Sequence, residues 1–384
     1  MFFLKRATIY LLQYIKTIQK GNSLTGQKNT QYGYHQDIYT ALDAITEAQK
    51  IAFSPIFFQA VLCMRNKGLL ACLDRAGKNG ADFDEIAKEI SLSDYAIELL
   101  LDVGLSMRVF YQKEARYFLG KIGHYLLHDK MTTVNINFTQ DICYQSMFYL
   151  QEALETGTPA GLKVFGDWPT IYPALQTLPE QAKKSWFEFD HFYSDHSFPA
   201  AFSHISQLNP KHIYDVGGNT GKWAMYCAKR CPDIKVTLLD LPQQIAIAEQ
   251  NIKQAGFEDR IDGIAVDLLT AETLPNKADI WWMSQFLDCF SVQQITHILI
   301  LIHHSMKDDA TLCIMDLFGD RQSFEGGALS VNASSLYFTC LANGNSRFYH
   351  SKVFYQCLSS AGFHVEQDID GLGYGHTLLI CKKR

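Results

Sequence analysis

Hydrophobic residues recur at helical spacing through the first third of the chain. Between residues 37 and 127 this pattern predicts successive amphipathic helices. One of them, within 80–90, opens with a turn and an Asp cap, and a second covers 95–107. Two short strands, 109–111 and 117–119, are expected around a tight turn. A helix, a turn, a second helix and a hairpin in this order predict a winged-helix module.

After residue 210 the pattern changes to short apolar runs that alternate with helical segments. This alternation predicts an α/β domain with a Rossmann-like, doubly wound and mostly parallel sheet that has helices on both faces. In such a sheet the ligand binds at the carboxyl ends of the strands. The expected strands are 212–216, 236–240, 261–266, 278–283 and 311–317.

A helical, aromatic-rich region joins these two parts. The aromatic side chains either pack in a core or line a pocket for a flat substrate, and the sequence leaves both readings open. They include Phe165, Trp168, Tyr172, Trp186 and Phe189.

The first 36 residues form an N-terminal extension. Lys5 and Arg6 precede the apolar run 7–15, which is a faint signal-peptide pattern, but no small-residue cleavage site follows. We therefore expect a packing helix there, or a start codon assigned too far upstream. No uncharged apolar run approaches the roughly 18 residues of a membrane span, so no membrane association is predicted.

Composition and charge narrow the class of protein. A chain of 384 residues with 47% hydrophobic side chains is long enough for two domains with substantial cores. Its net charge of −6 has the wrong sign for neutralising phosphates over a broad surface. The second helix of the winged-helix module also carries Asp94, Glu98 and Asp102 without a Lys or Arg. No nucleic-acid partner is therefore predicted, and the module is expected to serve packing or dimerisation.

The ten cysteines include no C-x-x-C pair, and Cys227 and Cys231 have the spacing of one helix face. We expect buried thiols in a reducing, cytoplasmic compartment. The adjacent histidines His303 and His304 are read as an exposed or hydrogen-bonded pair, and no metal site is predicted.

A glycine-rich turn carries the clearest chemistry. The segment 215–221 ends the first strand of the α/β part and precedes a helix, so the backbone can approach a ligand closely. Gly218 and Gly221 would be the last two glycines of a dinucleotide motif, but Val216 stands where the first must be. Asp215 would repel a pyrophosphate and attract an ammonium and a sulfonium, and S-adenosylmethionine carries both. A P-loop is excluded because no Gly-Lys-Ser/Thr follows.

An aspartate stands at the carboxyl end of each of the next two expected strands. Asp240 can reach a ribose hydroxyl pair, and Asp267 can accept from an exocyclic amine while Leu268 covers the base. With the glycine turn, these acids predict a nucleoside-bearing cofactor.

The chain thus resembles the class I S-adenosylmethionine-dependent methyltransferases, and within them the caffeate/hydroxyindole-type O-methyltransferases with an N-terminal winged-helix dimerisation domain. The resemblance runs from about Asp37 to the C-terminus, and the Asp-Leu-Pro at 240–242 is its most specific part. It extends to the segments 343–347 and 361–363 and to the closing hairpin up to Ile380. It implies a homodimer. The candidate cofactor residues are Asp215, Gly217, Gly218, Asp240, Leu241, Asp267, Leu268 and Ser284, the last at a position where many relatives place a Lys.

This resemblance divides the chain into four segments. They are the extension 1–36, a winged-helix dimerisation domain 37–128, a helical linker and substrate-pocket region 129–200, and an S-adenosylmethionine-binding methyltransferase domain 201–384.

The resemblance departs from the family at the catalytic centre. Relatives place a His as general base for the substrate hydroxyl, whereas this chain has Asp288 there. Asp316 matches the first flanking acid of the family, and Ser346 replaces the second. Proton transfer from a phenol to an unperturbed Asp is uphill by about six pKa units, roughly 8 kcal/mol. General-base help is worth about 10²–10⁴-fold and positioning about 7–11 kcal/mol, so loss of the His does not abolish methyl transfer.

Three interpretations of the centre stay open. In the first, a small phenolic metabolite is methylated on oxygen, with Asp288, Asp316 and His191 tuning its protonation, or with His196 in place of His191. In the second, a ring carbon ortho to the phenol is methylated in a pigment or natural-product pathway. In the third, the chain binds the cofactor without turnover and serves as a scaffold.

Overall fold

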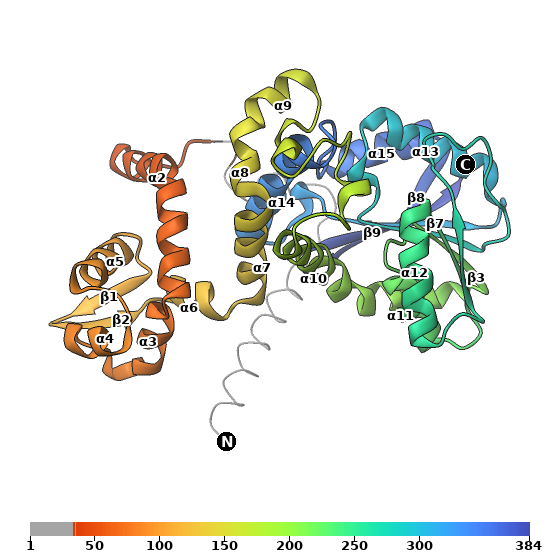
Figure 1. Ribbon diagram of the computed structural model, residues 1–384. Helices are drawn as coiled ribbons and strands as arrows, with labels where there is room; N and C mark the ends of the chain where they lie inside the picture. Colours follow the sequence, from red (N-terminus) through yellow and green to blue (C-terminus); the bar gives the residue numbers. More distant parts are fainter. Residues whose placement is uncertain (1–33, 35) are drawn as a thin grey trace. The chain divides into compact units, whose positions relative to one another are not determined.

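The computed structural model describes Tyr34 and residues 36–384, of which residues 39–384 form one compact unit (Figure 1). The packing helix expected in the extension 1–36 lies outside the described residues. Among the residues that are described, no single helix is long and apolar enough to cross a membrane. By length and composition alone, Ala41–Asn66 and Leu69–Asn79 pass that test together as a pair bent by 61°.

The N-terminal helices and the hairpin follow in the predicted order. Asp82 begins α4 with a capping box, because its carboxylate accepts from the Glu85 N–H and the Glu85 carboxylate accepts from the Asp82 N–H, each at 3.0 Å. Strands β1 and β2 pair antiparallel. The elements are α2 (Ala41–Asn66), α3 (Leu69–Ala76), α4 (Phe83–Glu89), α5 (Asp94–Ser106), β1 (Phe110–Lys113), β2 (Arg116–Leu119) and α6 (Lys121–His128).

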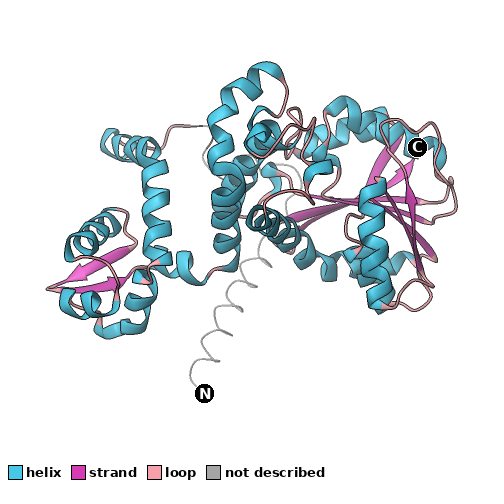
Figure 2. Ribbon diagram, in the orientation of Figure 1, coloured by secondary structure: helices cyan, strands magenta, loops and turns pink. Residues whose placement is uncertain are grey.

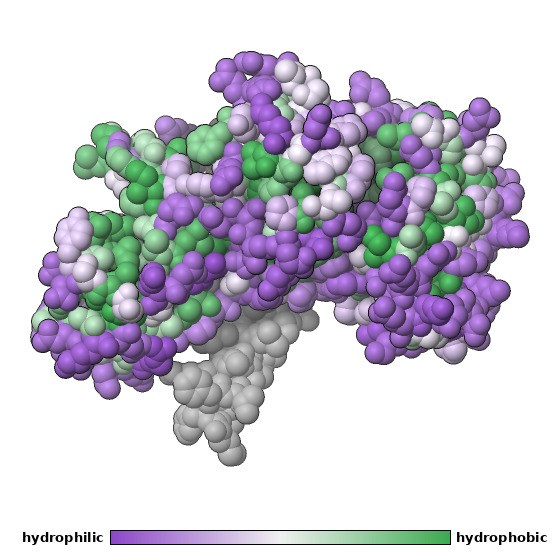
Figure 3. Space-filling model, in the orientation of Figure 1, coloured by the Kyte–Doolittle hydropathy of each residue, from purple (hydrophilic) through white to green (hydrophobic). Residues whose placement is uncertain are grey.

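Helix α2 is exposed to solvent before Pro55 and partly buried after it. Proline has no N–H to offer the carbonyl of Ile51, and the Ser54 hydroxyl donates to that carbonyl instead, at 2.9 Å. After the proline, α2 has the buried residues Val61, Leu62 and Met64, of which Met64 belongs to the core of the N-terminal helices. Before it, nearly every residue of 41–56 is exposed to solvent. Figure 3 shows hydrophobic side chains gathered over these N-terminal helices.

A set of helices follows the N-terminal part and precedes the sheet. The longest of them, α10, packs its first half in an aromatic cluster with Trp186 and Phe192, and its second half on the sheet with Phe198 and Ile205. Two π-helical turns, Thr139–Cys143 and Phe338–Ala342, flank the same aromatic cluster. The helices are α7 (Lys130–Phe138), α8 (Tyr144–Ser146), α9 (Leu150–Thr156) and α10 (Glu180–Ile205), with 3-10 turns at Met147–Tyr149, Ala160–Val164, Tyr172–Ala174 and Ser206–Leu208.

The C-terminal part is the predicted doubly wound sheet. Its seven strands lie in the order β5-β4-β3-β6-β7-β9-β8, and β9 alone runs opposite to the direction of the other six. Figure 2 shows the strands in magenta. The strands are β3 (His212–Val216), β4 (Lys235–Asp240), β5 (Ile261–Ala265), β6 (Ile280–Ser284), β7 (Thr311–Asp316), β8 (Phe363–Leu372) and β9 (His376–Lys383). The helices between and before them are α11 (Lys222–Arg230), α12 (Pro242–Ala255), α13 (Val292–Ser305), α14 (Glu325–Tyr337) and α15 (Ser351–Ser360).

Both faces of the sheet are covered. Trp281 and Trp282 are adjacent on β6 and fully buried on opposite faces, as expected of consecutive strand residues. The Trp281 side packs against α13 and α15, and the Trp282 side packs against α10, α11 and α12. Buried strands of this kind leave their carboxyl ends as the place where polar groups can face a ligand.

The cysteines are mostly buried free thiols, with Cys63 exposed. The expectation that Cys227 and Cys231 share one helix face is wrong, because α11 ends at Arg230. Cys231 has an extended backbone at the helix terminus.

Candidate active site

A cavity of about 350 Å³ lies at the carboxyl ends of β3, β4 and β6. Aromatic side chains of α7, α10 and α14 and of the segment after α14 form its far wall. Among its lining residues are four aspartates and no Lys, Arg or His. The acids are Asp190, Asp240, Asp267 and Asp288, and the aromatic lining comprises Phe138, Tyr172, Trp186, Phe189, Phe286, Phe290, Tyr337, Phe338 and Phe348.

The glycine turn after β3 brings its backbone to the cavity. Gly217 lines it with φ +72°, and a Cβ at this position would overlap the Phe286 ring. A Cβ at Gly218 would come within 2.9 Å of the Asp215 carboxylate. Both positions therefore require glycine, the first for its backbone conformation and the second for space.

Asp215 lies buried behind this turn. Its Oδ2 atom has no hydrogen-bond partner among the described residues. Burial, with the nearby Asp240 carboxyl adding to it, raises the pKa of Asp215 to about 8. A buried carboxyl with an unused acceptor atom is costly unless a cation or donor completes it, so Asp215 fits the ammonium of the expected cofactor.

Asp240 and Leu241 line the next part of the cavity at the end of β4. The Asp240 carboxylate accepts from the Asn219 N–H at 2.8 Å and from the Leu241 N–H at 2.7 Å, so its orientation is fixed. Burial nevertheless raises its pKa to about 6. The carboxylate keeps lone pairs for a hydroxyl pair in the cavity.

Asp267 and Leu268 follow β5 and also line the cavity. The Asp267 carboxylate accepts from the Leu269 N–H at 2.9 Å, and the Leu268 side chain is buried. Ser284, at the end of β6, does not line the cavity, but its hydroxyl is buried with no hydrogen-bond partner in the described part of the chain. The acids that end β4 and follow β5, Asp240 and Asp267, thus line one cavity, while Asp215 of β3 lies buried behind the glycine turn and outside this lining.

Asp288 sits on a single 3-10 turn, Leu287–Cys289, after β6. Only 2% of it is exposed, and it lines the cavity. Burial and the Asp190 carboxyl raise the pKa of Asp288 to about 7. Asp316 is buried at the end of β7, where burial and Asp288 hold its pKa well above the usual range. Its Oδ2 has no partner among the described residues, and its Oδ1 accepts from the Leu317 N–H.

His191 does not line this cavity. It lies in a neighbouring hollow with Lys222, and its Nδ1 is 3.8 Å from Asp190 Oδ2 and 3.9 Å from Asp195 Oδ1. Burial lowers its pKa. The residue before it, Asp190, faces the cavity instead, since consecutive residues of a helix point about 100° apart. His196 also stays outside, with its Nδ1 2.7 Å from the Phe192 carbonyl.

Sequence reasoning missed the residue that holds the Asp288 turn. Asn343 donates from Nδ2 to the Cys289 carbonyl at 2.7 Å and to the Ser346 hydroxyl at 2.8 Å. Its Oδ1 accepts from the Ser346 N–H at 3.1 Å. The Asn-Gly-Asn-Ser run at 343–346 was a visible turn signal, but its contact with residue 289 depends on the tertiary fold.

Two non-glycine residues of the lining have left-handed backbones, which is a strained conformation typical of functional sites. Asn219 has φ +50° and Gln285 has φ +47°. The Gln285 amide oxygen is 3.0 Å from Nε2 of the buried His376, and His376 Nδ1 is 2.7 Å from the Ser197 hydroxyl. Burial lowers the pKa of His376 to about 3, so this support of the cavity wall carries no charge near neutral pH.

The aromatic wall is locked by ring contacts and one buried hydrogen bond. Phe138 stacks on Phe189 with ring centroids 4.0 Å apart and lies edge-on to Tyr337 at 5.0 Å. The Trp186 indole N–H donates to the Tyr337 hydroxyl at 2.6 Å. The wall is therefore a fixed, flat and mostly apolar surface. Trp186 and Phe189 therefore line the cavity, as one of the two readings of the aromatic region expected. Trp186 also packs in the buried aromatic core.

Comparisons with known proteins place these features in a family. Residues 200–364 match a family described as O-methyltransferase domain, and residues 46–117 match a Dimerisation2-like domain. The L-tyrosine C(3)-methyltransferase of Streptomyces lavendulae is 24% identical over 80% of this chain and 84% of its own length. Acetylserotonin O-methyltransferase of Homo sapiens is 23% identical over 73% and 82%. The apo structure of the S-adenosylmethionine-dependent methyltransferase SibL has a TM-score of 0.70 at 21% identity, covering 88% of this chain and 99% of that one.

Replacing Asp240 by Ala is expected to weaken binding of S-adenosylmethionine and its demethylated product by at least about 100-fold, because a charged, preorganised acceptor is lost. Isothermal titration calorimetry on the purified full chain measures this. The matched control is Asp262→Ala, an exposed acid on the neighbouring strand β5. Unchanged affinity of the Asp240 variant would refute the cofactor site.

Proposed function

Because the chain belongs to the family of S-adenosylmethionine-dependent O-methyltransferases, we propose that it methylates a small aromatic, phenolic metabolite in the cavity above the sheet. One observation carries this proposal. A single cavity joins strand-end acids suited to the cofactor with a flat aromatic wall and a buried carboxyl, Asp288. Residues 201–384 then bind the cofactor, and residues 129–200 supply much of the substrate wall.

The cofactor half of the cavity is suited to a cationic nucleoside. Asp215 offers its unused Oδ2 atom to an ammonium, and Asp240 offers acceptor positions to the ribose hydroxyls. In this proposal Asp267 accepts from the adenine amine beside Leu268. Gly217 and Leu241 line the adjoining wall, and Gly218 lies behind it against Asp215. Ser284, at the end of β6, has a buried hydroxyl with no hydrogen-bond partner among the described residues. The bound cofactor supplies an electrophilic methyl group on a sulfonium.

The substrate half combines apolar rings with acids that lack a basic partner in the lining. Phe138, Phe189 and Tyr337 provide flat contact for an aromatic ring. The Asp190 carboxyl raises the pKa of Asp288, because like charges at short range repel each other. An acceptor with a basic nitrogen relieves this repulsion, whereas one with a carboxylate adds to it. We therefore favour phenols that carry an amine.

Asp288 is the proposed general base. With its pKa near 7, proton transfer from a phenol is uphill by about three units, roughly 4 kcal/mol, about half the cost for an unperturbed Asp. Asp316 is buried near Asp288, and burial together with the Asp288 charge raises the pKa of Asp316 well above its usual range. His191 lies outside the cavity, so we assign it an indirect effect on the charge of Asp190.

Methylation of a ring carbon is the second candidate. It is favoured by the Asp at the position of the family's His base, and by the relative named L-tyrosine C(3)-methyltransferase, which matches 80% of the chain. Here Asp288 would take the phenol proton, and the electron-rich ortho carbon would accept the methyl group. The ring proton at that carbon would then pass to solvent, and Asp288 would return its proton to the phenolate oxygen. Oxygen and carbon methylation thus use the same residues and differ in which atom of the ring faces the methyl group.

A panel of phenols tests the proposal directly. Matched acceptors that carry an amine, an uncharged group or a carboxylate on the same ring are incubated with methyl-labelled S-adenosylmethionine. We expect label in the amine-bearing acceptor, with kcat/KM at least about tenfold above that of the carboxylate. Mass spectrometry and NMR of the product identify the methylated atom. Asp190→Asn should reduce the ratio of kcat/KM between the amine-bearing and the carboxylate-bearing acceptor. Cofactor binding without transfer to any phenol would instead support the scaffold interpretation.

The pH profile of Asp288 gives a second test. The base is active only when deprotonated and its pKa is raised, so the wild-type rate should increase as pH rises through about 7. Asp288→Asn should lose this ascending limb and fall by at least about 10²-fold in kcat. Asp308→Asn, a fully exposed acid, is the control. If Asp288→Asn keeps the full rate and the same pH profile, Asp288 is not the general base, and catalysis rests on positioning of the substrate alone.

We also propose that residues 37–128 form the dimerisation domain, with the helix–helix–hairpin order of a winged helix. The first half of α2 supports this, because it has almost no buried residue and carries five exposed apolar side chains. Leu42 is 78% and Ile51 is 75% exposed, and Ile45, Phe53 and Ile56 accompany them. The segment falls largely within the match to the Dimerisation2-like domain, so a second copy of the chain is the partner that fits this surface.

The dimer is tested by sedimentation equilibrium. The full chain should have twice the 43.6 kDa mass of one protomer. Ile51→Asp should shift it to the monomer, because it places a charge in a buried apolar contact. Gln49→Asp adds the same charge at an exposed polar position of α2 and should stay dimeric. A monomeric wild type, or a dimeric Ile51 variant, would contradict the assignment.

A further inference from the structure

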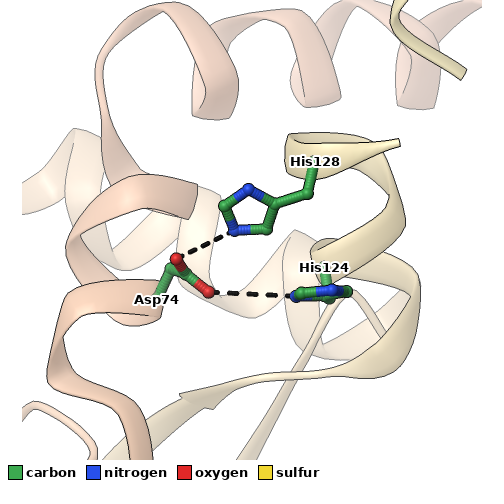
Figure 4. Close-up of side chains that lie close together, drawn as sticks. All are labelled: Asp74, His124 and His128. Carbon is green, nitrogen blue, oxygen red and sulfur yellow. Dashed lines mark hydrogen bonds and ion pairs between the residues drawn. The ribbon is translucent and has the colours of Figure 1, made fainter. Parts of the chain in front are cut away.

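Three ligand-type side chains meet on the surface of the N-terminal domain, in a cluster that has no part in the cavity. Asp74 lies in the last turns of α3, and His124 and His128 lie four residues apart on α6 (Figure 4). His128 Nε2 is 2.9 Å from Asp74 Oδ2, and His124 Nδ1 is 3.9 Å from Asp74 Oδ1. The two imidazole rings flank one carboxylate, with ring centroids 4.7 Å apart.

The spacing of these groups suits a transition metal. Histidines at i and i+4 project from the same helix face, so both can ligate one ion without a change of backbone. One ligand atom from each residue lies within 4.8 Å of the other two. Tetrahedral Zn²⁺ with bonds of about 2.0–2.1 Å needs ligand atoms roughly 3.3 Å apart. Side-chain rotation closes the difference, because all three side chains reach solvent.

A purely ionic explanation accounts less well for the cluster. An ion pair of Asp74 with the nearer ring, His128 at 2.9 Å, leaves His124 at 3.9 Å without a role. Two imidazoles and one carboxylate together make a set of three ligands for one divalent ion. Arg75, next in sequence to Asp74, pairs with Glu89.

We propose that Asp74, His124 and His128 bind a divalent transition metal ion of the Zn²⁺ type, which clamps α3 to α6. Nitrogen ligands favour Zn²⁺, Ni²⁺ or Cu²⁺ over the hard ions Mg²⁺ and Ca²⁺. Three protein ligands leave the remaining position to water. Since α6 follows the hairpin and precedes α7, the ion would fix the end of the N-terminal domain against its own core helix. This inference is independent of the proposed function.

The test uses the full chain without an affinity tag, after treatment with a chelator. Titration with ZnCl₂ should show one site with a dissociation constant in the micromolar range, and an excess of Mg²⁺ should not displace the ion. Hydrogen–deuterium exchange should slow in the 121–128 peptide when Zn²⁺ is added. His124→Ala, His128→Ala and Asp74→Asn should each weaken this binding at least tenfold and abolish the added protection.

The control is His297→Ala, which removes an exposed histidine on α13 and should leave the zinc site unchanged. Circular dichroism and methylation of the best phenol confirm that the cluster variants are folded, because none of these residues touches the cavity. If zinc binds the wild type and all three variants equally, or does not protect residues 121–128, the site is refuted.

Discussion

The structure depends on negative charge buried at one edge of the sheet. Parallel strands that are covered on both faces expose their polar residues only at the strand ends, and here those ends carry Asp215, Asp240 and Asp316, with Asp267 and Asp288 just beyond. Burial raises the pKa of four of these five acids. Such a cluster destabilises an empty site unless protons or a cation neutralise it. The cavity is therefore suited to a ligand that arrives with positive charge.

Helix α10 links this charge to the shape of the cavity. It is long enough to place Trp186 and Asp190 at the substrate wall while its far end, around Ala201 and Ile205, packs in the core beneath the sheet. A change that tilts α10 would thus move the aromatic wall and one acid together. The neutral contact between His376, Ser197 and Gln285 ties the same helix to β9 and to the turn after β6. Helix α10 consequently couples part of the cavity's shape to part of its charge.

Local patterns predicted much of the fold, because the information was local. Apolar runs specified the five parallel strands to within one or two residues, and Asp82 signalled the start of α4. The strand-end acids were also readable, since parallel strands align their carboxyl ends. The sequence does not show which side of α10 faces the cavity. His191 was the predicted catalytic residue, but Asp190 lines the cavity instead. Asp74 meets His128 across 54 positions of sequence, and Asn343 meets Cys289 across another 54, so only tertiary packing reveals either contact.

The solvent exposure of the first half of α2 affects its stability as a helix. A stretch of about 16 residues is close to the minimum length at which a helix persists in water without packing. In the proposed dimer this segment is ordered by association, which makes its folding a second-order process. At high dilution the segment should fray while the sheet domain, which has its own two-sided core, stays intact. The amount of protein present would in this way set how much of the N-terminal domain is fully ordered.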